Sequence, residues 1–453
     1  MDLFSAFARQ IEQTAVRQVL IAFSGGLDST ALLSLFQKLR EKRAHFSSNL
    51  TLRAIHIHHG LSANADHWAA HCRNICEQLK IPLIIERVQV DGHNGIEAAA
   101  REARYRAIRR HIQPNEVLAT AHHLNDQTET FFLALKRGSG LRGLASMRCS
   151  NELLGMPIFR PLLNFSREQL EGYVRTEKLT WIHDESNDDE HYDRNFLRHR
   201  ILPELRERWR HFDASVARSA QHCFEQQQLI DELLQETFAQ HCQMPTEFQL
   251  FDFARYSPAK QAALLRKWLA INGCEMPSKY RLEQLIQDVI CAKEDANPAF
   301  RLNEKVLRRY QSCLYLTSDF LDLDGICLEL NDSVLVLPDN LGKLDLTCTT
   351  EKFIFRWQRY SIELPPTNLP IFVRFGYHGK VKRHPKRPRE TIKKIWQELG
   401  VPPWQRTRIP LIFYGDELQS ALGFFRVFKP AKNEIDRTFS RSFGIMSQIY
   451  KTR

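Results

Sequence analysis

Apolar runs of strand length alternate with helical patterns through the first half of the chain. Residues 19–23 are consecutively apolar, and the patterns over 52–57, 82–88 and 117–120 also predict strands. Amphipathic patterns over 31–39, 65–79, 96–112 and 124–136 follow these runs. Unbroken apolar runs are typical of strands buried on both faces. This alternation predicts an α/β fold with a doubly wound parallel sheet, whose ligand site lies at the carboxyl ends of the strands.

The pattern changes after Pro203. Long helical patterns over 215–238, 260–269 and 281–289 predict a separate helical domain, in which the apolar positions form the core. From residue 306, short alternating runs at 313–316, 326–330 and 334–337 predict a smaller α+β unit. We therefore divide the chain into a catalytic domain at 1–212, a helical substrate- or tRNA-binding domain at 213–305 and a C-terminal basic domain at 306–453.

A glycine corner joins the first predicted strand to the first long helix. A strand, a glycine turn and a helix start bring free N–H groups and the positive end of a helix dipole together, which favours phosphate binding. The loop contains no Lys, as G-x-x-x-x-G-K-[ST] would require, so it suits release of pyrophosphate better than γ-phosphoryl transfer. The alternative is an ordinary glycine turn. The predicted phosphate-binding residues are Ser24, Gly25, Gly26, Leu27, Asp28, Ser29 and Thr30.

Composition narrows the class of protein. A net charge of +10 and a pI near 9.1 favour a polyanionic partner. The ten cysteines include no C-x-x-C pair, so we expect no zinc site, iron–sulfur site or disulfide framework, and a reduced, cytoplasmic setting. Neither a signal peptide nor an apolar run of membrane-spanning length is present, so we expect no membrane association.

Polar clusters follow the second and third predicted strands. His56, His58 and His59 end the second strand, where a metal site is possible but contacts of His56 and His59 with a nucleotide, or simple packing, are favoured. Arg101 and Arg104 share one face of the next helix, where the alternative to ligand binding is a solvated face with a salt bridge.

Another polar cluster follows the fourth predicted strand. His122, Asp126 and Glu129 lie at the strand end and in the first helical turns after it, where they suit acid–base chemistry or Mg²⁺ positioning. Zinc is the weaker alternative because only two ligands are secured. Further on, two arginines four apart, Arg194 and Arg198, flank Asn195 and suit a clamp on phosphate or a carboxylate. In isolation they equally suit a surface ion pair.

Two basic segments suit contact with a polyanion. The run 138–143 formally matches G-x-G-x-x-G, but it follows a helix rather than a strand, so the dinucleotide interpretation is rejected. Its turn carries Arg137 and Arg142. The second segment combines basic residues with prolines and a nearby Trp, which suits RNA backbone and unpaired bases, although such runs are usually solvated faces. Its predicted tRNA-binding residues are Lys380, Lys382, Arg383, Lys386, Arg387, Trp404 and Arg406.

The motifs resemble one family. Ser24-Gly25-Gly26-Leu27-Asp28-Ser29 is similar to the SGGxDS loop of the Rossmann-like PP-loop ATP pyrophosphatases. Over residues 19 to about 205 the chain resembles the tRNA(Ile)-lysidine synthetase family, and VRFG at 373–376 and VPPWQR at 401–406 resemble its C-terminal domain. Ser62 departs from the Arg that many members carry, which puts that substrate contact in doubt. The motifs shared with the family are SGGLDS, IHIHHGL, EAAAREARY, AHHLNDQTET, RGSGLRGL, FRPLL, DESN and RNFLR.

The resemblance implies a reaction. ATP, with Mg²⁺, adenylates the C2 oxygen of the wobble cytidine of an isoleucine tRNA with a CAU anticodon, and free L-lysine then attacks C2 and expels AMP to give lysidine. Asp28, His122, Asp126 and Glu129 are the expected catalytic residues, and Asp28 and Asp126 the expected Mg²⁺ partners. We expect lysine or phosphate to meet Arg101, Arg104, Arg194, Asn195 and Arg198. Members of this family are often homodimers.

Two other functions compete with this one. Thiolation of tRNA within the same superfamily would need a reactive cysteine or an iron–sulfur site near the loop, and the missing C-x-x-C argues against it. A noncatalytic RNA-binding protein with a dead nucleotide fold would have lost acidic residues, yet Asp28, Asp126 and Glu129 are present. Both remain open to test by asking whether lysine or sulfur enters tRNA.

Overall fold

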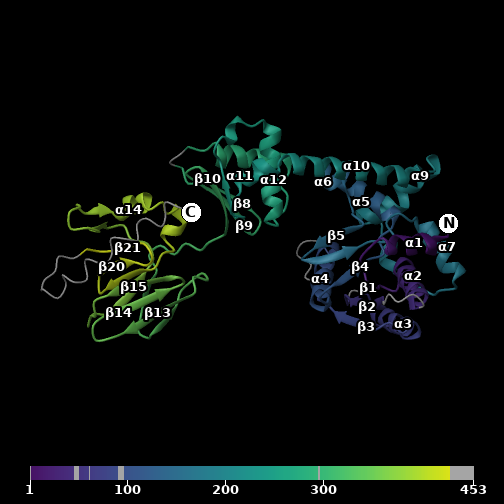
Figure 1. Ribbon diagram of the computed structural model, residues 1–453, viewed down its shortest axis with the longest axis horizontal. Coiled ribbons are helices and arrows are strands. Elements are labelled where there is room, and N and C mark those ends of the chain that lie inside the picture. Colours follow the sequence, from purple (N-terminus) through teal and green to yellow (C-terminus); the bar gives the residue numbers. More distant parts are fainter. Residues whose placement is uncertain (1, 45–49, 61, 90–95, 294–295, 429–453) are drawn as a thin grey trace. The chain divides into compact units, whose positions relative to one another are not determined.

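The computed structural model describes residues 2–44, 50–60, 62–89, 96–293 and 296–428. They divide into two compact units, residues 1–233 and 234–453 (Figure 1). No helix in the described ranges is long and apolar enough to cross a membrane.

Unit 1 is built on a six-stranded sheet in the order β3-β2-β1-β4-β6-β5. All neighbouring pairs are parallel except the β5–β6 hairpin at one edge. The order reverses between β1 and β4, so their carboxyl ends border the crevice in which such folds bind ligands. This confirms the predicted doubly wound sheet. The strands are β1 (Gln18–Ala22), β2 (Thr51–His58), β3 (Leu83–Arg87), β4 (Glu116–Ala119), β5 (Ser150–Leu153) and β6 (Met156–Phe159).

Helices cover both faces of this sheet. Val19 and Ile21 on β1 pack into a core shared with α1, α2, α3 and α7, whereas Leu20 packs with Tyr105 of α4 on the other face. The unbroken apolar run of β1 therefore has a physical reason, because both of its faces are buried. The helices are α1 (Leu3–Glu12), α2 (Leu27–Ala44), α3 (Ala65–Gln78), α4 (Ile96–His111), α5 (Leu124–Lys136), α6 (Leu141–Leu144), α7 (Arg167–Thr176), α8 (Asp193–Phe196), α9 (Leu202–Arg208) and α10 (Phe212–Leu233), with short turns η2 (Glu185–Asp188) and η3 (Leu197–Ile201).

Unit 1 extends further along the chain than residue 212, where we placed the boundary. Helix α10 packs against α5 and α6, and Arg142 of α6 forms an ion pair of 3.0 Å with Asp231 near the end of α10. The helical pattern over 215–238 therefore spans two helices, α10 of unit 1 and α11 (Gln235–His241) of unit 2, and the two units divide after Leu233.

The first part of unit 2 combines helices with a four-stranded antiparallel sheet in the order β7-β10-β9-β8. Trp268 of α12 is fully buried in its core together with Leu307 of β9 and Leu314 of β10. The strands that begin at residue 305 therefore complete this core rather than starting the C-terminal domain. The elements are β7 (Glu247–Gln249), η4 (Phe253–Arg255), α12 (Pro258–Ile271), α13 (Lys279–Leu285), η5 (Ile286–Ile290), β8 (Ala299–Leu302), β9 (Lys305–Tyr310) and β10 (Cys313–Ser318).

The C-terminal part of unit 2 is rich in antiparallel strands. One sheet has the order β11-β16-β19-β20-β21 and another β12-β13-β14-β15, with a small β17–β18 ribbon before α14. The elements are β11 (Cys327–Glu329), β12 (Val334–Val336), β13 (Lys343–Cys348), β14 (Phe353–Trp357), β15 (Tyr360–Leu364), β16 (Ile371–Arg374), β17 (Lys380–Val381), β18 (Glu390–Thr391), α14 (Ile392–Glu398), α15 (Pro403–Arg406), β19 (Leu411–Tyr414), β20 (Glu417–Ala421) and β21 (Phe425–Arg426).

Candidate functional site

The glycine corner between β1 and α2 is held by its own side chains. The hydroxyls of Ser24 and Ser29 lie 3.0 Å apart, and Ser29 donates to the carbonyl of Gly26. The Thr30 hydroxyl donates to the carbonyl of Gly25 at 3.3 Å. These bonds fix the loop while the first N–H groups of α2, at its positive dipole end, remain available to an anion. Leu27 is the first residue of this helix.

Residues distant in sequence pack directly beneath the corner. Gly25 has a φ of +86°, and a Cβ at this position would lie 2.6 Å from Cδ1 of Ile182 and 2.9 Å from Sγ of Cys72. The backbone N–H of Ile182 also donates to the carbonyl of Gly25 at 2.9 Å. Glycine is therefore required here for both its backbone conformation and its lack of a side chain.

His56 supports this corner from the neighbouring strand. Its Nδ1 lies 3.0 Å from the carbonyl oxygen of Phe23 and 3.4 Å from Sγ of Cys72. Burial lowers the pKa of His56, so the ring is neutral near pH 7. The structure thus places His56 in the packing beneath the loop, the simpler of the two roles that its position allows.

His59 lies beside an arginine from the next helix. Its Nε2 is 3.4 Å from Nε of Arg104, which donates to it. Burial, and secondarily the charge of Arg104, lower the pKa of His59 to about 4. Arg101, one turn earlier on α4, has its guanidinium 5.2 Å from the centroid of the Tyr105 ring. Arg104 and His59 are therefore brought together, whereas Arg101 packs on its own helix.

The loop after β4 meets the glycine corner through a residue that the sequence analysis did not single out. His123 is the N-cap of α5, and its Nε2 lies 3.6 Å from Oδ2 of Asp28 and 3.5 Å from Oδ2 of Asp126. The sequence signal was available, because His123 and Asp126 have the spacing of a capping box. The Asp126 side chain accepts from the His123 backbone N–H at 3.0 Å, and the His123 ring accepts from the Asp126 N–H.

The pKa values of the two histidines in this loop are shifted in opposite directions. Burial opposes charge on His123, but the carboxylates of Asp126 and Asp28 outweigh it and raise the pKa of the ring. Burial lowers the pKa of His122 to about 3, against the attraction of Asp126. Its Nδ1 shares a hydrogen bond of 2.8 Å with the Thr120 hydroxyl. His122 is therefore neutral at physiological pH.

A partly buried arginine links the two carboxylates of α5. Arg198 donates to both oxygens of Glu129, at 2.7 and 2.9 Å, and to Oδ1 of Asp126 at 3.2 Å. Glu129 is only 1% exposed. Burial would raise the pKa of Asp126, but the adjacent histidines and then Arg198 lower it. Arg194 lies 3.6 Å from Glu129 and donates to Thr130. The predicted arginine pair is thus part of the site.

Asn195, between these arginines, binds backbone carbonyls rather than the carboxylates. Its side-chain amide donates to the carbonyls of Ser186 and Asp189, both at 2.9 Å, and the residue is buried. It therefore holds the segment that follows Ile182 in place. This positions the chain beneath the glycine corner rather than presenting the amide to a ligand.

The carboxylates differ in their fitness for a metal ion. No group of three or more potential ligands lies together within the described ranges. Oδ1 of Asp28 is buried without a hydrogen-bond partner, whereas both oxygens of Asp126 already accept hydrogen bonds. A hard cation that accompanies ATP therefore fits Asp28 better than Asp126.

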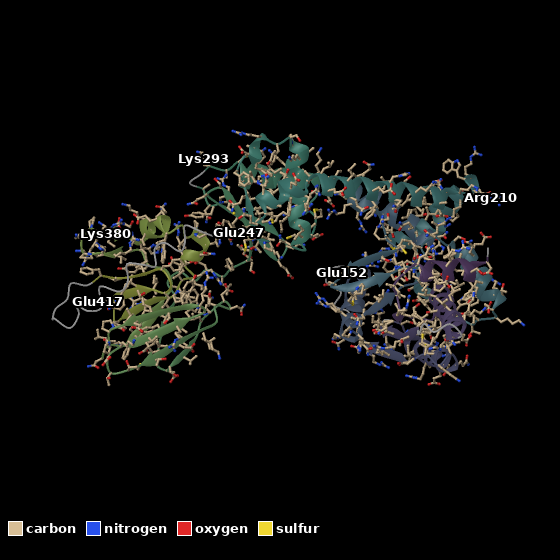
Figure 2. The ribbon with its side chains drawn as sticks, viewed as in Figure 1. Glu152, Arg210, Glu247, Lys293, Lys380 and Glu417 are labelled. Carbon is tan, nitrogen blue, oxygen red and sulfur yellow. The ribbon has the colours of Figure 1, made fainter. Side chains whose placement is uncertain are left out.

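The predicted tRNA-binding residues divide into exposed and internal ones. Lys380 (Figure 2), Lys386 and Arg387 are exposed, as is Arg137 in unit 1. Lys382 lies 5.7 Å from the Phe428 ring. Arg383 is only 16% exposed and pairs with Glu390 at 3.1 Å and with Glu398.

Trp404 packs inside unit 2, and Arg406 is engaged by the backbone beside it. The Trp404 ring is 8% exposed and lies 5.4 Å from the Tyr315 ring, centroid to centroid. Nε of Arg406 donates to the carbonyl of Val401 at 2.9 Å. A ring packed in this way has no open face for a base, so the tRNA prediction depends on the exposed lysines and arginines.

Known proteins match nearly the whole chain. A PP-loop domain matches residues 3–205, a TilS substrate binding domain matches 248–315 and a TilS substrate C-terminal domain matches 371–436. A tRNA(Ile)-lysidine synthase of Haemophilus influenzae (strain 86-028NP) is 65% identical over 94% of this chain and 99% of its own length. The tRNA(Ile)-lysidine synthase of Actinobacillus succinogenes is 55% identical over 94% of this chain and all of its own.

Proposed function

Because the chain belongs to the tRNA(Ile)-lysidine synthase family, we propose that it uses ATP to convert the wobble cytidine of a CAU-anticodon isoleucine tRNA into lysidine. In this reaction the cytidine C2 oxygen attacks the α-phosphate of ATP and pyrophosphate leaves. The ε-amine of free lysine then adds at C2, and AMP departs with the oxygen. One C–N bond forms in the tRNA, and ATP ends as AMP and pyrophosphate.

At the site, the proposal is supported by the closeness of Asp28 and His123. The carboxyl ends of β1 and β4 are neighbours, and Asp28 and His123 from the two following loops lie 3.6 Å apart. The glycine corner and the polar, arginine-linked cluster therefore lie next to each other at the carboxyl ends of these strands. ATP bound at the corner would have its reacting α-phosphate near groups that stabilise charge.

The corner has the features needed for pyrophosphate departure. Negative charge grows on the leaving group, and the N–H groups and dipole at the start of α2 are oriented before the reaction begins. We expect Arg104, which donates to the neutral ring of His59, to contact a phosphate or the lysine carboxylate. Asp28 would hold the Mg²⁺ that accompanies ATP, and the ion would supply positive charge next to the phosphates.

The nucleophile must lose a proton before it attacks, since a lysine amine in water has a pKa of about 10.4. Glu129 and Asp126 have their oxygens engaged by Arg198 and by backbone N–H. His122 is neutral and uses Nδ1 to contact Thr120. A ring whose pKa is about 3 is too weak a base for an ammonium proton, so we propose that the lysine amine loses its proton to water rather than to any of these three groups.

The high pKa values of the nearby cysteines argue against thiolation of tRNA. Cys72 lies next to the glycine corner, but burial raises its pKa to about 12, as it does for Cys76. A thiol with such a pKa is not a sulfur-carrying nucleophile near pH 7.

The test is direct. Purified protein is incubated with a CAU-anticodon isoleucine tRNA transcript, ATP, Mg²⁺ and isotopically labelled lysine, and the nucleosides are then analysed by mass. We expect labelled lysine on cytidine only when ATP is present. A transcript whose wobble cytidine is replaced by uridine is the matched control. Incorporation of sulfur instead of lysine, or no modification by folded protein, would contradict the proposal.

A further inference from the structure

An exposed tryptophan stands between two arginines where α9 meets α10. Trp209 ends α9 and is 54% exposed. Arg208 and Arg210 on either side of it are also exposed, and Figure 2 labels Arg210 at this corner of unit 1. Single exposed apolar residues are common and need no explanation. At this position, the residues around Trp209 indicate a function for its exposed ring.

The Trp209 ring is held in place on one side. It stacks on the Phe212 ring, with centroids 5.8 Å apart and planes 26° apart, and Phe212 in turn packs against Phe132 of α5 at 6.0 Å. The backbone N–H of Phe212 donates to the carbonyl of Trp209 at 3.0 Å, which fixes the turn between the two helices. One face of the indole is therefore anchored to the body of unit 1, and the residue keeps half of its surface in solvent.

The arginines at this corner differ in whether they have an acidic partner. Arg206, one turn earlier, forms a two-point ion pair with Asp213 at 2.8 and 3.0 Å. Within the described ranges, no carboxylate lies within ion-pair distance of Arg208 or Arg210. A hollow of about 630 Å³ is lined by Arg208, Trp209, Arg210, His211, Phe212 and Ser215. A flat ring, a hollow and two uncompensated cations thus lie together.

This corner is rigidly connected to the candidate active site. Arg198, which holds Glu129 and Asp126, lies on η3, and η3 runs directly into α9 and then Trp209. Eleven residues at the helical rise of 1.5 Å separate the two positions by about 16 Å. Stacked nucleotides rise about 3.4 Å each along a strand, so a segment of about five nucleotides spans this distance.

We propose that the Arg208–Phe212 corner is a docking site for single-stranded RNA, at which Trp209 stacks on an unpaired base of the substrate tRNA while Arg208 and Arg210 contact the adjacent phosphates. The inference rests on the proposed function, which brings an unpaired loop of tRNA to this unit. Proteins that bind single strands combine stacking rings with cations in this manner. An acidic protein would satisfy the arginines but would have no use for a preorganised, half-open indole face.

Binding of the tRNA separates this inference from catalysis. The full-length protein is titrated with fluorescently labelled CAU-anticodon isoleucine tRNA at several salt concentrations. We expect Trp209→Ala to weaken binding by about 5- to 150-fold, the range for the loss of one base–aromatic stack, and Trp209→Phe to restore most of it. Arg208→Gln with Arg210→Gln should lower the slope of log affinity against log salt by about 1.4 for two single-strand phosphate contacts. Arg175→Gln, at an exposed position on α7, is the matched control.

A second measurement guards against a trivial loss of folding. The KM for ATP and the thermal midpoint should stay at the wild-type values in all four variants, whereas the KM for tRNA should rise with the dissociation constant. Wild-type tRNA affinity and salt slope in Trp209→Ala and the double arginine variant would overturn the inference, even if an acidic protein were found to bind there. If the wild type binds tRNA but makes no lysidine, the proposed function fails while the docking site is still judged by these binding data.

Discussion

Glu129 and Arg198 form a two-point ion pair across 69 residues of sequence, with distances of 2.7 and 2.9 Å between their side chains. Glu129 is 1% exposed, so the pair lies in the interior, where the same arginine also reaches Asp126. Sequence spacing suggested that Glu129 could accept a proton. Its environment makes it a positioning residue, because both of its oxygens are bound to the cation that orients Asp126.

Breaking this pair should cost stability as well as activity. Glu129→Ala removes the two-point partner of Arg198, which keeps only its bond to Asp126, and we expect the free energy of unfolding of unit 1 to fall by about 1.5–3 kcal/mol. Glu171→Gln is the control, because its partner Arg175 is exposed and such pairs are worth about 1 kcal/mol or less. Urea unfolding measures both. Equal losses in the two variants would show that Glu129 is not buried against Arg198.

Gly25→Ala tests the packing beneath the loop. The new Cβ would meet Ile182 and Cys72 within 3 Å, at a φ of +86°. We expect lower stability and at least a tenfold weaker affinity for ATP, measured by thermal unfolding and by equilibrium binding. Gly172→Ala on α7 meets no atom within 4 Å and should stabilise the protein by about 0.5–1 kcal/mol. Unchanged ATP affinity in Gly25→Ala would mean that the corner does not hold the nucleotide.

Asp28→Asn separates chemistry from folding. Oδ1 of Asp28 has no partner and Oδ2 lies 3.6 Å from Nε2 of His123, so the loss of stability should be that interaction together with about 0.3–1 kcal/mol from the dipole of α2. We expect tRNA-dependent exchange between pyrophosphate and ATP to disappear. Exchange at the wild-type rate would refute the role of Asp28 beside the phosphates.

The pKa of His122 predicts acid sensitivity. The folded protein keeps this ring neutral down to about pH 3, whereas the unfolded chain binds the proton near pH 6.5, so stability falls as the pH drops between these values. By this linkage, His122 alone removes about 2 kcal/mol between pH 7 and pH 5. His122→Gln should flatten the curve of unfolding free energy against pH by that amount. His67→Gln, at an exposed position on α3, is the matched control.

In the basic segment of unit 2, substitutions of exposed side chains and of the ion-paired Arg383 should have different effects. Lys386→Gln and Arg387→Gln should each lower the salt slope of tRNA binding by about 0.7–0.9. Arg383→Gln should instead lower the stability of this unit by about 1–3 kcal/mol, since it breaks bonds to Glu390 and Glu398. Thermal unfolding and the salt titration distinguish the two effects. A normal salt slope in both exposed-residue variants would argue against this surface.

Local pattern was enough to predict the parallel sheet, the glycine corner and the polar cluster after β4. Those features depend on periodicity and on which residues end a strand, both of which are visible in sequence. The packing of Trp404 against Tyr315 was not visible, because a Trp after a basic run suits RNA and core equally well. The division of the chain after Leu233 could not be predicted from the sequence either. A helical pattern does not show which neighbouring element a helix packs against.

The bond from Ile182 to Gly25 sets an order of events during synthesis. The first glycine of the loop leaves the ribosome more than 150 residues before the segment that packs beneath it and the arginines that fix Asp126 and Glu129. A nascent chain can therefore form β1 and α2 early, yet it completes the ATP site only after residue 198 has emerged. By this argument the enzyme cannot consume ATP until the chain through Arg198 has been made.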